Sequence, residues 1–193
     1  MKSLRNTLER FSRDESGTLM AEALIVLPFM LWAYLALFVY WDAYRAVNTA
    51  QKAAYTISDM ISREMVTLPT NYVTGMRDLM RYLIDKDQTV KLRVTSVTWS
   101  SANARFEVDW SRSPDNAMPQ QTTTTIATSA YRIPAMADGD RVIIVDAEVS
   151  YHPAFDIGMP AFDVGMHDEV IKQFIVTRPR FIPKLCMTGV TCT

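Results

Sequence analysis

An acidic residue lies inside the most apolar part of this sequence. Glu22 is the only charged residue between positions 18 and 41. A carboxylate surrounded by hydrocarbon is costly, so it requires protonation or a cationic partner. If the chain were cut after Gly17, Thr18 would carry a free ammonium, and Glu22 could pair with the Thr18 ammonium of a neighbouring copy. Alternatively, Glu22 lies close enough to the end of the apolar segment to reach polar headgroups.

The cysteines offer a second possible chemistry. Cys186 and Cys192 stand close together near the end of the sequence, with Gly189 between them. In an oxidising compartment they are expected to close a small disulfide loop, worth about 2–3 kcal/mol. The alternative is a metal pair, but two thiols with only His152 and His167 make a poor ligand set.

Nothing else in the sequence indicates catalysis. There is no phosphate-binding glycine loop, no H-E-x-x-H and no G-x-S-x-G motif. His152 and His167 are interpreted as surface residues, and Asp138-Gly139-Asp140 as a turn, since two carboxylates are too few for calcium. We therefore expect no enzyme, no cofactor, no metal and no small-molecule substrate. The net charge of -1 also argues against a nucleic-acid partner.

The element that positions Glu22 is the apolar segment 18–41. About 20 apolar residues span a bilayer core, and backbone groups in lipid must bond internally, so a transmembrane helix is predicted. Pro28 is expected to bend this helix without breaking it. Aromatic residues at its far end are typical of an interfacial belt, and basic residues before it place the N-terminus in the cytoplasm. A cleaved signal peptide or a buried core helix would need a shorter apolar run.

This N-terminal pattern resembles a known family. A basic leader, Gly17, Glu22 and a long apolar helix resemble the class III signal of type IV pilins. The string 14–17 (DESG) followed by 21–28 (AEALIVLP) resembles, more specifically, TadE-like minor pilins, or pseudopilins, of the tight-adherence (Flp) pilus system. The resemblance is strongest over about residues 10–60, and a weaker one covers the end, where a strand-like run closes in 178–180 (RPR). In major pilins of that system an aromatic residue usually follows the glutamate; here Ala23 does, and the chain is long.

The resemblance implies a role in pilus assembly, with secretion and cell adhesion as its context. A prepilin peptidase would cut between Gly17 and Thr18, and the subunit would meet other pilin-like subunits and the assembly platform through its helix. It would lie in a bacterial inner membrane as a single-pass protein with a periplasmic C-terminal domain; its entry into a surface pilus is left open. The alternative is an uncleaved, single-span extracytoplasmic binding or sensor domain.

We expect four segments: a cytoplasmic basic leader (1–17) that is removed, the transmembrane helix (18–41), an extracytoplasmic continuation of that helix (42–66), and an extracytoplasmic domain (67–193). A stripe of small and apolar residues follows helical spacing to about Met65. It is expected to pack either on the chain's own domain or on other subunits. The stripe comprises Ala43, Val47, Ala50, Ala54, Ile57, Ile61 and Met65.

The C-terminal domain is predicted to be α+β, with a second short helix and an antiparallel sheet of about four strands. A helical pattern covers 73–84, and alternating patterns predict strands at 90–99, 106–110, 141–151 and 169–178. The threonine-rich stretch 111–125 is expected to be irregular, followed by a short helix at 126–133. The apolar segment 154–165, interrupted by Gly and Pro, is expected to form a loop on a membrane-proximal or partner surface.

Overall fold

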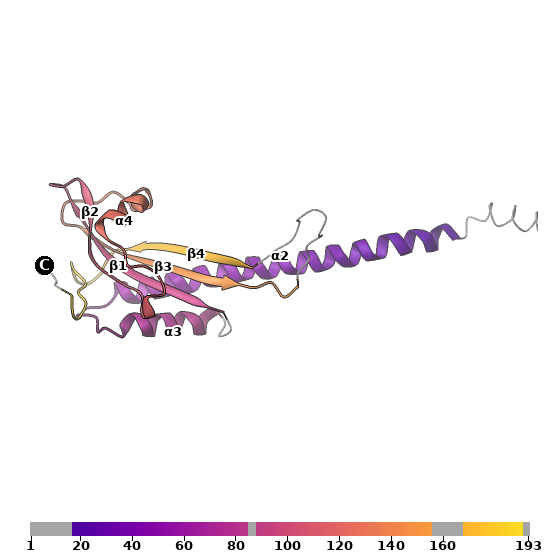
Figure 1. The fold of residues 1–193 in the computed structure, drawn as a ribbon, viewed down its shortest axis with the longest axis horizontal. Helices are drawn as coiled ribbons and strands as arrows, with labels where there is room; N and C mark the ends of the chain where they lie inside the picture. Colours follow the sequence, from indigo (N-terminus) through magenta and orange to yellow (C-terminus); the bar gives the residue numbers. More distant parts are fainter. Residues whose placement is uncertain (1–16, 85–87, 156–167, 191–193) are drawn as a thin grey trace, which may run out of the picture. The chain divides into compact units, whose positions relative to one another are not determined.

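The computed structural model describes residues 17–84, 88–155 and 168–190. It divides into two compact units, Met1–Asp42 with Pro153–Met166, and Ala43–His152 with His167–Thr193, which are described separately. The helix α2 (Thr18–Ser62) contributes to both units. The remaining elements belong to the second unit (Figure 1): α3 (Tyr72–Ile84), β1 (Val90–Ser100), β2 (Arg105–Arg112), η2 (Pro114–Asn116), α4 (Thr123–Ile126), η3 (Ala127–Arg132), β3 (Arg141–Tyr151) and β4 (Glu169–Thr177).

Helix α2 is continuous through Pro28, as predicted. It ends at Ser62, however, earlier than the predicted Met65. Leu68 forms a bridge with Met187, so the chain must leave the helix before reaching it. The backbone N–H of Arg180 donates to the Ser62 carbonyl at 2.8 Å. This contact gives a partner to one of the carbonyls that every helix end leaves open.

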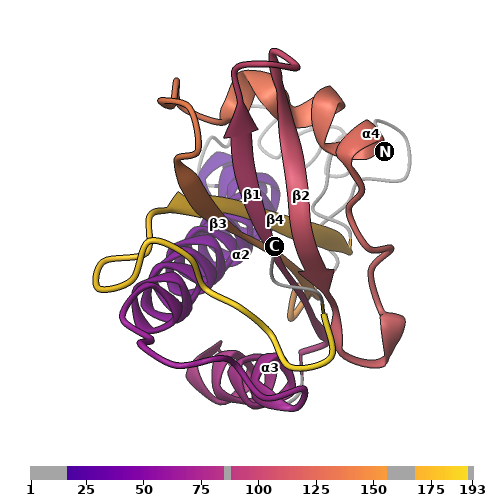
Figure 2. The same ribbon diagram turned by 90° about the vertical axis from the view of Figure 1, so that its left-hand side faces the viewer.

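The second unit is built on a four-stranded antiparallel sheet with the order β2-β1-β3-β4 (Figure 2). The predicted α+β class is thus confirmed. β1 and β3 are the two central strands. Successive residues of each strand point to opposite faces of the sheet, and both faces carry buried residues. A register shift between Ser96 and Val97 leaves Asp109 as the extra residue of a β-bulge in β2.

Helices α2 and α3 cover one face of this sheet. The core between them joins small residues of α2 to apolar residues of α3, β1 and β3, so the helix can approach the sheet closely. Its fully buried members include Ala50, Ala54, Ile57, Met80, Leu92, Val94, Ile143 and Val145. Burial of this apolar surface is the main contribution that holds α2 on the sheet.

The opposite face is covered by α4 and η3. Ile126 and Ile133 pack there on Val97, Val142 and Ile144. The threonine run was wrongly predicted to be irregular, because α4 starts at Thr123. A reciprocal capping box between Thr122 and Thr125 offsets the low helix propensity of threonine. The helical stretch then ends at Arg132.

Residues 178–190 form a C-terminal strap that the sequence did not predict. The Leu68 N–H donates to the Cys186 carbonyl, and the Thr188 N–H donates to the Leu68 carbonyl, both at 2.9 Å. The indole N–H of Trp110 donates to the Leu185 carbonyl at 2.8 Å. Because Leu185 and Met187 are buried, the strap is part of the core.

Candidate functional site

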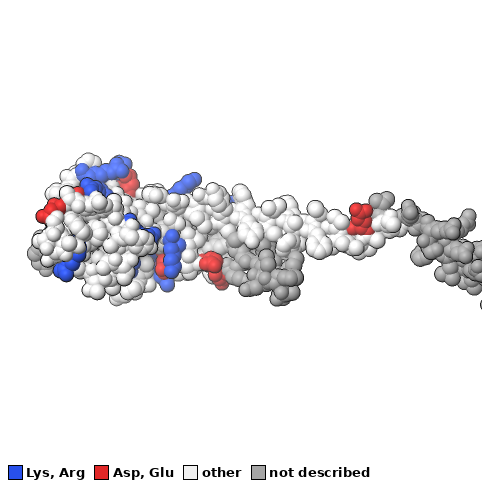
Figure 3. Space-filling model, turned by 90° about the horizontal axis from the view of Figure 1, so that it is seen from above, with Lys and Arg blue, Asp and Glu red and all other residues white. Residues whose placement is uncertain are grey.

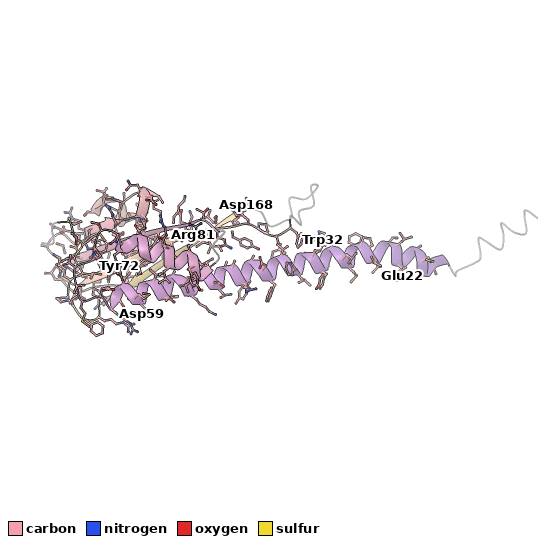
Figure 4. The ribbon with its side chains drawn as sticks, turned by 90° about the horizontal axis from the view of Figure 1, so that it is seen from below. Glu22, Trp32, Asp59, Tyr72, Arg81 and Asp168 are labelled. Atoms are coloured by element: carbon pink, nitrogen blue, oxygen red, sulfur yellow. The ribbon has the colours of Figure 1, made fainter. Side chains whose placement is uncertain are left out.

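The predicted processing and assembly residues stand at the start of α2. Gly17, Thr18 and Glu22 are all exposed, and Glu22 projects from the N-terminal part of the helix (Figure 4). A separation of four residues places Glu22 about 6 Å beyond Thr18 along the helix axis, on the same face. The Glu22 side chain is therefore accessible to a second molecule, and the ammonium of Thr18 would form only after cleavage.

Gly17 is not needed for packing in the described structure. A Cβ at this position would meet no atom within 4 Å, and the backbone there is not among the positive-φ glycines, which are Gly139 and Gly189. A larger side chain at position 17 is therefore compatible with the fold. An effect of such a change on maturation would reflect recognition of the site.

The N-terminal part of α2 exposes most of its apolar side chains, although Ala36 and Val39 are buried. In the described chain this is one helix long and apolar enough to cross a membrane, and only 11% of its most apolar window is buried. The visible face of this part is almost without charge (Figure 3). Exposed fractions of 57–76% are found at Leu24, Ile25, Leu27, Phe29, Met30, Leu31 and Leu37. Such a surface requires lipid or other helices to cover it.

The C-terminal part of α2 behaves differently. Ala50, Ala54, Ile57 and Ile61 are at most 1% exposed because they pack against the sheet. Packing on the chain's own domain, one of the two alternatives for the stripe, is therefore confirmed for this part. Val47 is instead 41% exposed, and Met65 lies beyond the end of the helix.

Aromatic residues mark the change between the two parts of α2. Tyr40, Trp41 and Tyr44 are 50%, 59% and 70% exposed. Their rings are accessible where the apolar segment gives way to the amphipathic one. This is the position in which tyrosine and tryptophan serve as interfacial anchors.

The acidic pair around Gly139 forms the predicted turn. The Ser101 N–H donates to the Asp138 carboxylate at 2.7 Å, and this bond lowers the pKa of Asp138. Asp140 accepts from the Ala137 N–H and pairs with Arg178 at 3.1 Å. Gly139 has a φ of +74°, which glycine adopts without strain. The Asp140 carboxylate thus bonds the backbone of the turn, and the Asp138 carboxylate joins the turn to Ser101, directly after β1.

Other predicted site residues are only partly described. His152 is exposed, as predicted, and its Nδ1 lies 2.9 Å from the Asp168 carboxylate. His167 and most of the predicted loop 154–165 lie outside the described residues. Cys192 also lies outside them, so its disulfide with Cys186 stays a prediction. Within the described ranges, no group of three or more His, Cys, Asp and Glu side chains is arranged to hold a metal ion.

Comparison with family models, curated proteins and solved structures finds no match for this chain. The architecture is nevertheless pilin-like: a long apolar N-terminal helix is followed by a four-stranded antiparallel sheet that packs on the C-terminal part of that helix.

Proposed function

We propose that this chain is a non-enzymatic minor pilin of the TadE-like kind that serves the assembly of a tight-adherence pilus. The observation that carries the proposal is the division of α2. Its C-terminal part is buried on its own sheet, while its N-terminal part, which begins at Thr18 and carries Glu22, leaves most of its apolar surface uncovered. A helix of this kind fits a subunit that first lies in lipid and then packs against other helices.

In this proposal the apolar segment 18–41 spans the inner membrane, with the N-terminus in the cytoplasm and the sheet domain in the periplasm. A prepilin peptidase removes the leader after Gly17. The partners are then other pilin-like subunits and the assembly platform. The exposed aromatic residues Tyr40, Trp41 and Tyr44 support an interface at the outer end of the segment.

Glu22 has a physical role in this assembly. Cleavage creates an ammonium on Thr18, and a carboxylate from another copy neutralises it inside a bundle of apolar helices. An isolated charge in that environment is costly, so the paired arrangement is favoured over subunits that do not align. The pair thereby selects the axial register in which two helices meet.

The N-terminus of the membrane form tests the proposal. Mass spectrometry of the purified chain is expected to show Thr18 as the first residue in cells that contain the peptidase. Gly17→Val should leave the leader attached, and because a side chain at 17 contacts nothing, unfolding of the sheet domain should be unchanged. A mature chain that still begins at Met1 would contradict the proposal.

Assembly is tested separately at Glu22. Glu22→Ala should insert into the membrane and be cut normally, yet reduce incorporation into the pilus or its assembly complex severalfold. Glu169→Gln, at the exposed start of β4, is the matched control and should assemble as the parent does. Normal assembly of the Glu22 variant would remove the pairing role.

The alternative of an uncleaved binding or sensor domain has one supporting feature. A cavity of about 520 Å³ lies between the β1–β2 hairpin and the α4–η3 segment, lined by Trp99, Phe106, Ala127 and Ala130 among others. The rings of Trp99 and Phe106 pack edge to face, with their centroids 4.8 Å apart. An apolar, aromatic pocket is the usual form of a small-ligand site. This alternative does not explain Gly17 and Glu22.

A further inference from the structure

A residue beyond β3 contacts the apolar segment of α2. The ring of Phe155 lies 6.2 Å, centre to centre, from the ring of Phe38, with an angle of 57° between their planes. Both rings belong to the same compact unit, so the contact does not depend on how the two units are placed. Phe155 is 51% exposed and Phe38 is 43% exposed, while the adjacent Val39 is 1% exposed.

This contact fixes the depth of Phe155 relative to α2. Phe38 precedes Trp41 by less than one helical turn, so it lies about 4–5 Å further into the apolar segment along the helix axis. Trp41 and Tyr44 mark the outer end of that segment. A ring that touches Phe38 must therefore lie at the level of this end, on its apolar side.

We infer that Phe155 is a second membrane contact of this protein, seated at the boundary between acyl chains and headgroups beside α2. The inference rests on the proposed membrane span of 18–41. A ring with half its surface uncovered, at this depth, is surrounded by lipid. Phenylalanine gains free energy from leaving water, and the acyl boundary accepts an apolar ring without an unpaired polar group.

The sequence around Phe155 supports a lipid surface as the occupant. Residues 153–159 read PAFDIGM and residues 160–166 read PAFDVGM, a direct repeat that contains no Lys or Arg. Each copy carries one Phe, one Ile or Val and one Met, with a single Asp. The two copies differ only in that Ile157 is replaced by Val164. Residues 156–166 lie outside the described residues.

Spin labels can measure the depth of Phe155 directly. The full chain would be reconstituted in phosphatidylcholine vesicles with a nitroxide at Phe155→Cys, and collisions would be measured with oxygen, which concentrates in lipid, and with a water-soluble nickel chelate. Phe181→Cys is the matched water-side control, since Phe181 is 58% exposed, and Leu31→Cys is the lipid-side control. The unsubstituted chain gives the background from Cys186 and Cys192.

The expected ratio of oxygen to nickel collisions is severalfold higher at 155 than at 181, and similar to or somewhat below that at 31. A second label at Ala154→Cys, which keeps the Phe155 ring, should also give a collision ratio well above that at position 181 and no higher than about that at position 31. If the collision ratios at positions 154 and 155 equal the ratio at position 181, while the ratio at position 31 indicates lipid, this inference fails and the membrane span stands. Few collisions with both reagents at 155 would mean that protein covers it, which also overturns the inference. If 31 also reports water, the span itself is wrong.

Discussion

Arg93 and Asp146 form an ion pair between the central strands β1 and β3, on the face of the sheet that α2 does not cover. The guanidinium nitrogens Nε and Nη2 lie 3.0 and 2.8 Å from the same carboxylate oxygen, and each side chain is 11% exposed. Burial raises the pKa of Asp146, and the charge and hydrogen bonds of Arg93 act against this. Arg93 also donates to the Pro119 carbonyl, so it joins the sheet to the loop before α4.

Arg93→Met should destabilise the second unit by about 3–5 kcal/mol, because it leaves a buried carboxylate without its cation. The double variant Arg93→Met/Asp146→Leu should recover most of that loss, since an apolar pair avoids the desolvation cost of both charges. Urea unfolding of the full chain in detergent measures both. A double variant as unstable as the single one would show that the loss comes from the Pro119 contact instead.

The loss of stability caused by Arg93→Met should also depend on pH. Without Arg93, burial and the charge of Glu148 raise the pKa of Asp146, and only the weaker effect of the Arg132 charge opposes them. The pKa of Asp146 is therefore raised further in the folded state. A raised folded pKa contributes stability at low pH that is lost as pH rises through it. The destabilisation relative to the parent should therefore be smaller near about pH 4 than at about pH 7. A difference that does not change with pH would contradict this account.

Asp138 should show the opposite pH dependence. The Ser101 N–H holds the pKa of Asp138 below its usual value of 3.8 in the folded chain. A lowered folded pKa contributes stability above 3.8, which is lost as pH falls through the folded value. The advantage of the parent over Asp138→Asn should thus be present at neutral pH and vanish in acid. Urea midpoints across pH measure it, with Glu169→Gln as the control.

Two neighbouring positions on α2 test how closely the helix approaches the sheet. Ala54 is fully buried and Tyr55 is 54% exposed. Ala54→Leu should destabilise the second unit by about 1–3 kcal/mol, since a well-packed core has no room for the added atoms. Tyr55→Leu should change stability by no more than about 0.5 kcal/mol. A loss of less than about 0.5 kcal/mol for Ala54→Leu would contradict tight packing at this position.

The strap can be loosened at Trp110. Trp110→Phe removes the donor to the Leu185 carbonyl and should cost about 1–3 kcal/mol, because a buried acceptor is left unpaired. Hydrogen exchange at the amides of Leu68 and Thr188 should accelerate, as both bond across the strap. Trp99→Phe, which keeps an aromatic ring beside Phe106, should leave these amides unchanged. Faster exchange in both variants would show a general loss of stability.

Local pattern was sufficient for most elements. The alternation in 90–99 and 141–151 predicted the two central strands. The stretch 18–62 contains no Gly and a single Pro, which predicted one long helix. The pattern was less reliable where a side chain bonds its own backbone. Thr122 and Thr125 start a helix through a reciprocal cap, although threonine runs usually favour irregular structure.

Hydropathy, periodicity and the Gly17–Glu22 spacing are properties of neighbouring residues, so most elements and the candidate site could be predicted from the sequence. The strand order, the end of α2 at Ser62, the strap on Leu68, the Arg93–Asp146 pair and the contact of Phe155 with Phe38 became visible in the folded chain. Each of these joins residues far apart in the chain. Such contacts are selected by the packing of the whole unit, which no local periodicity encodes.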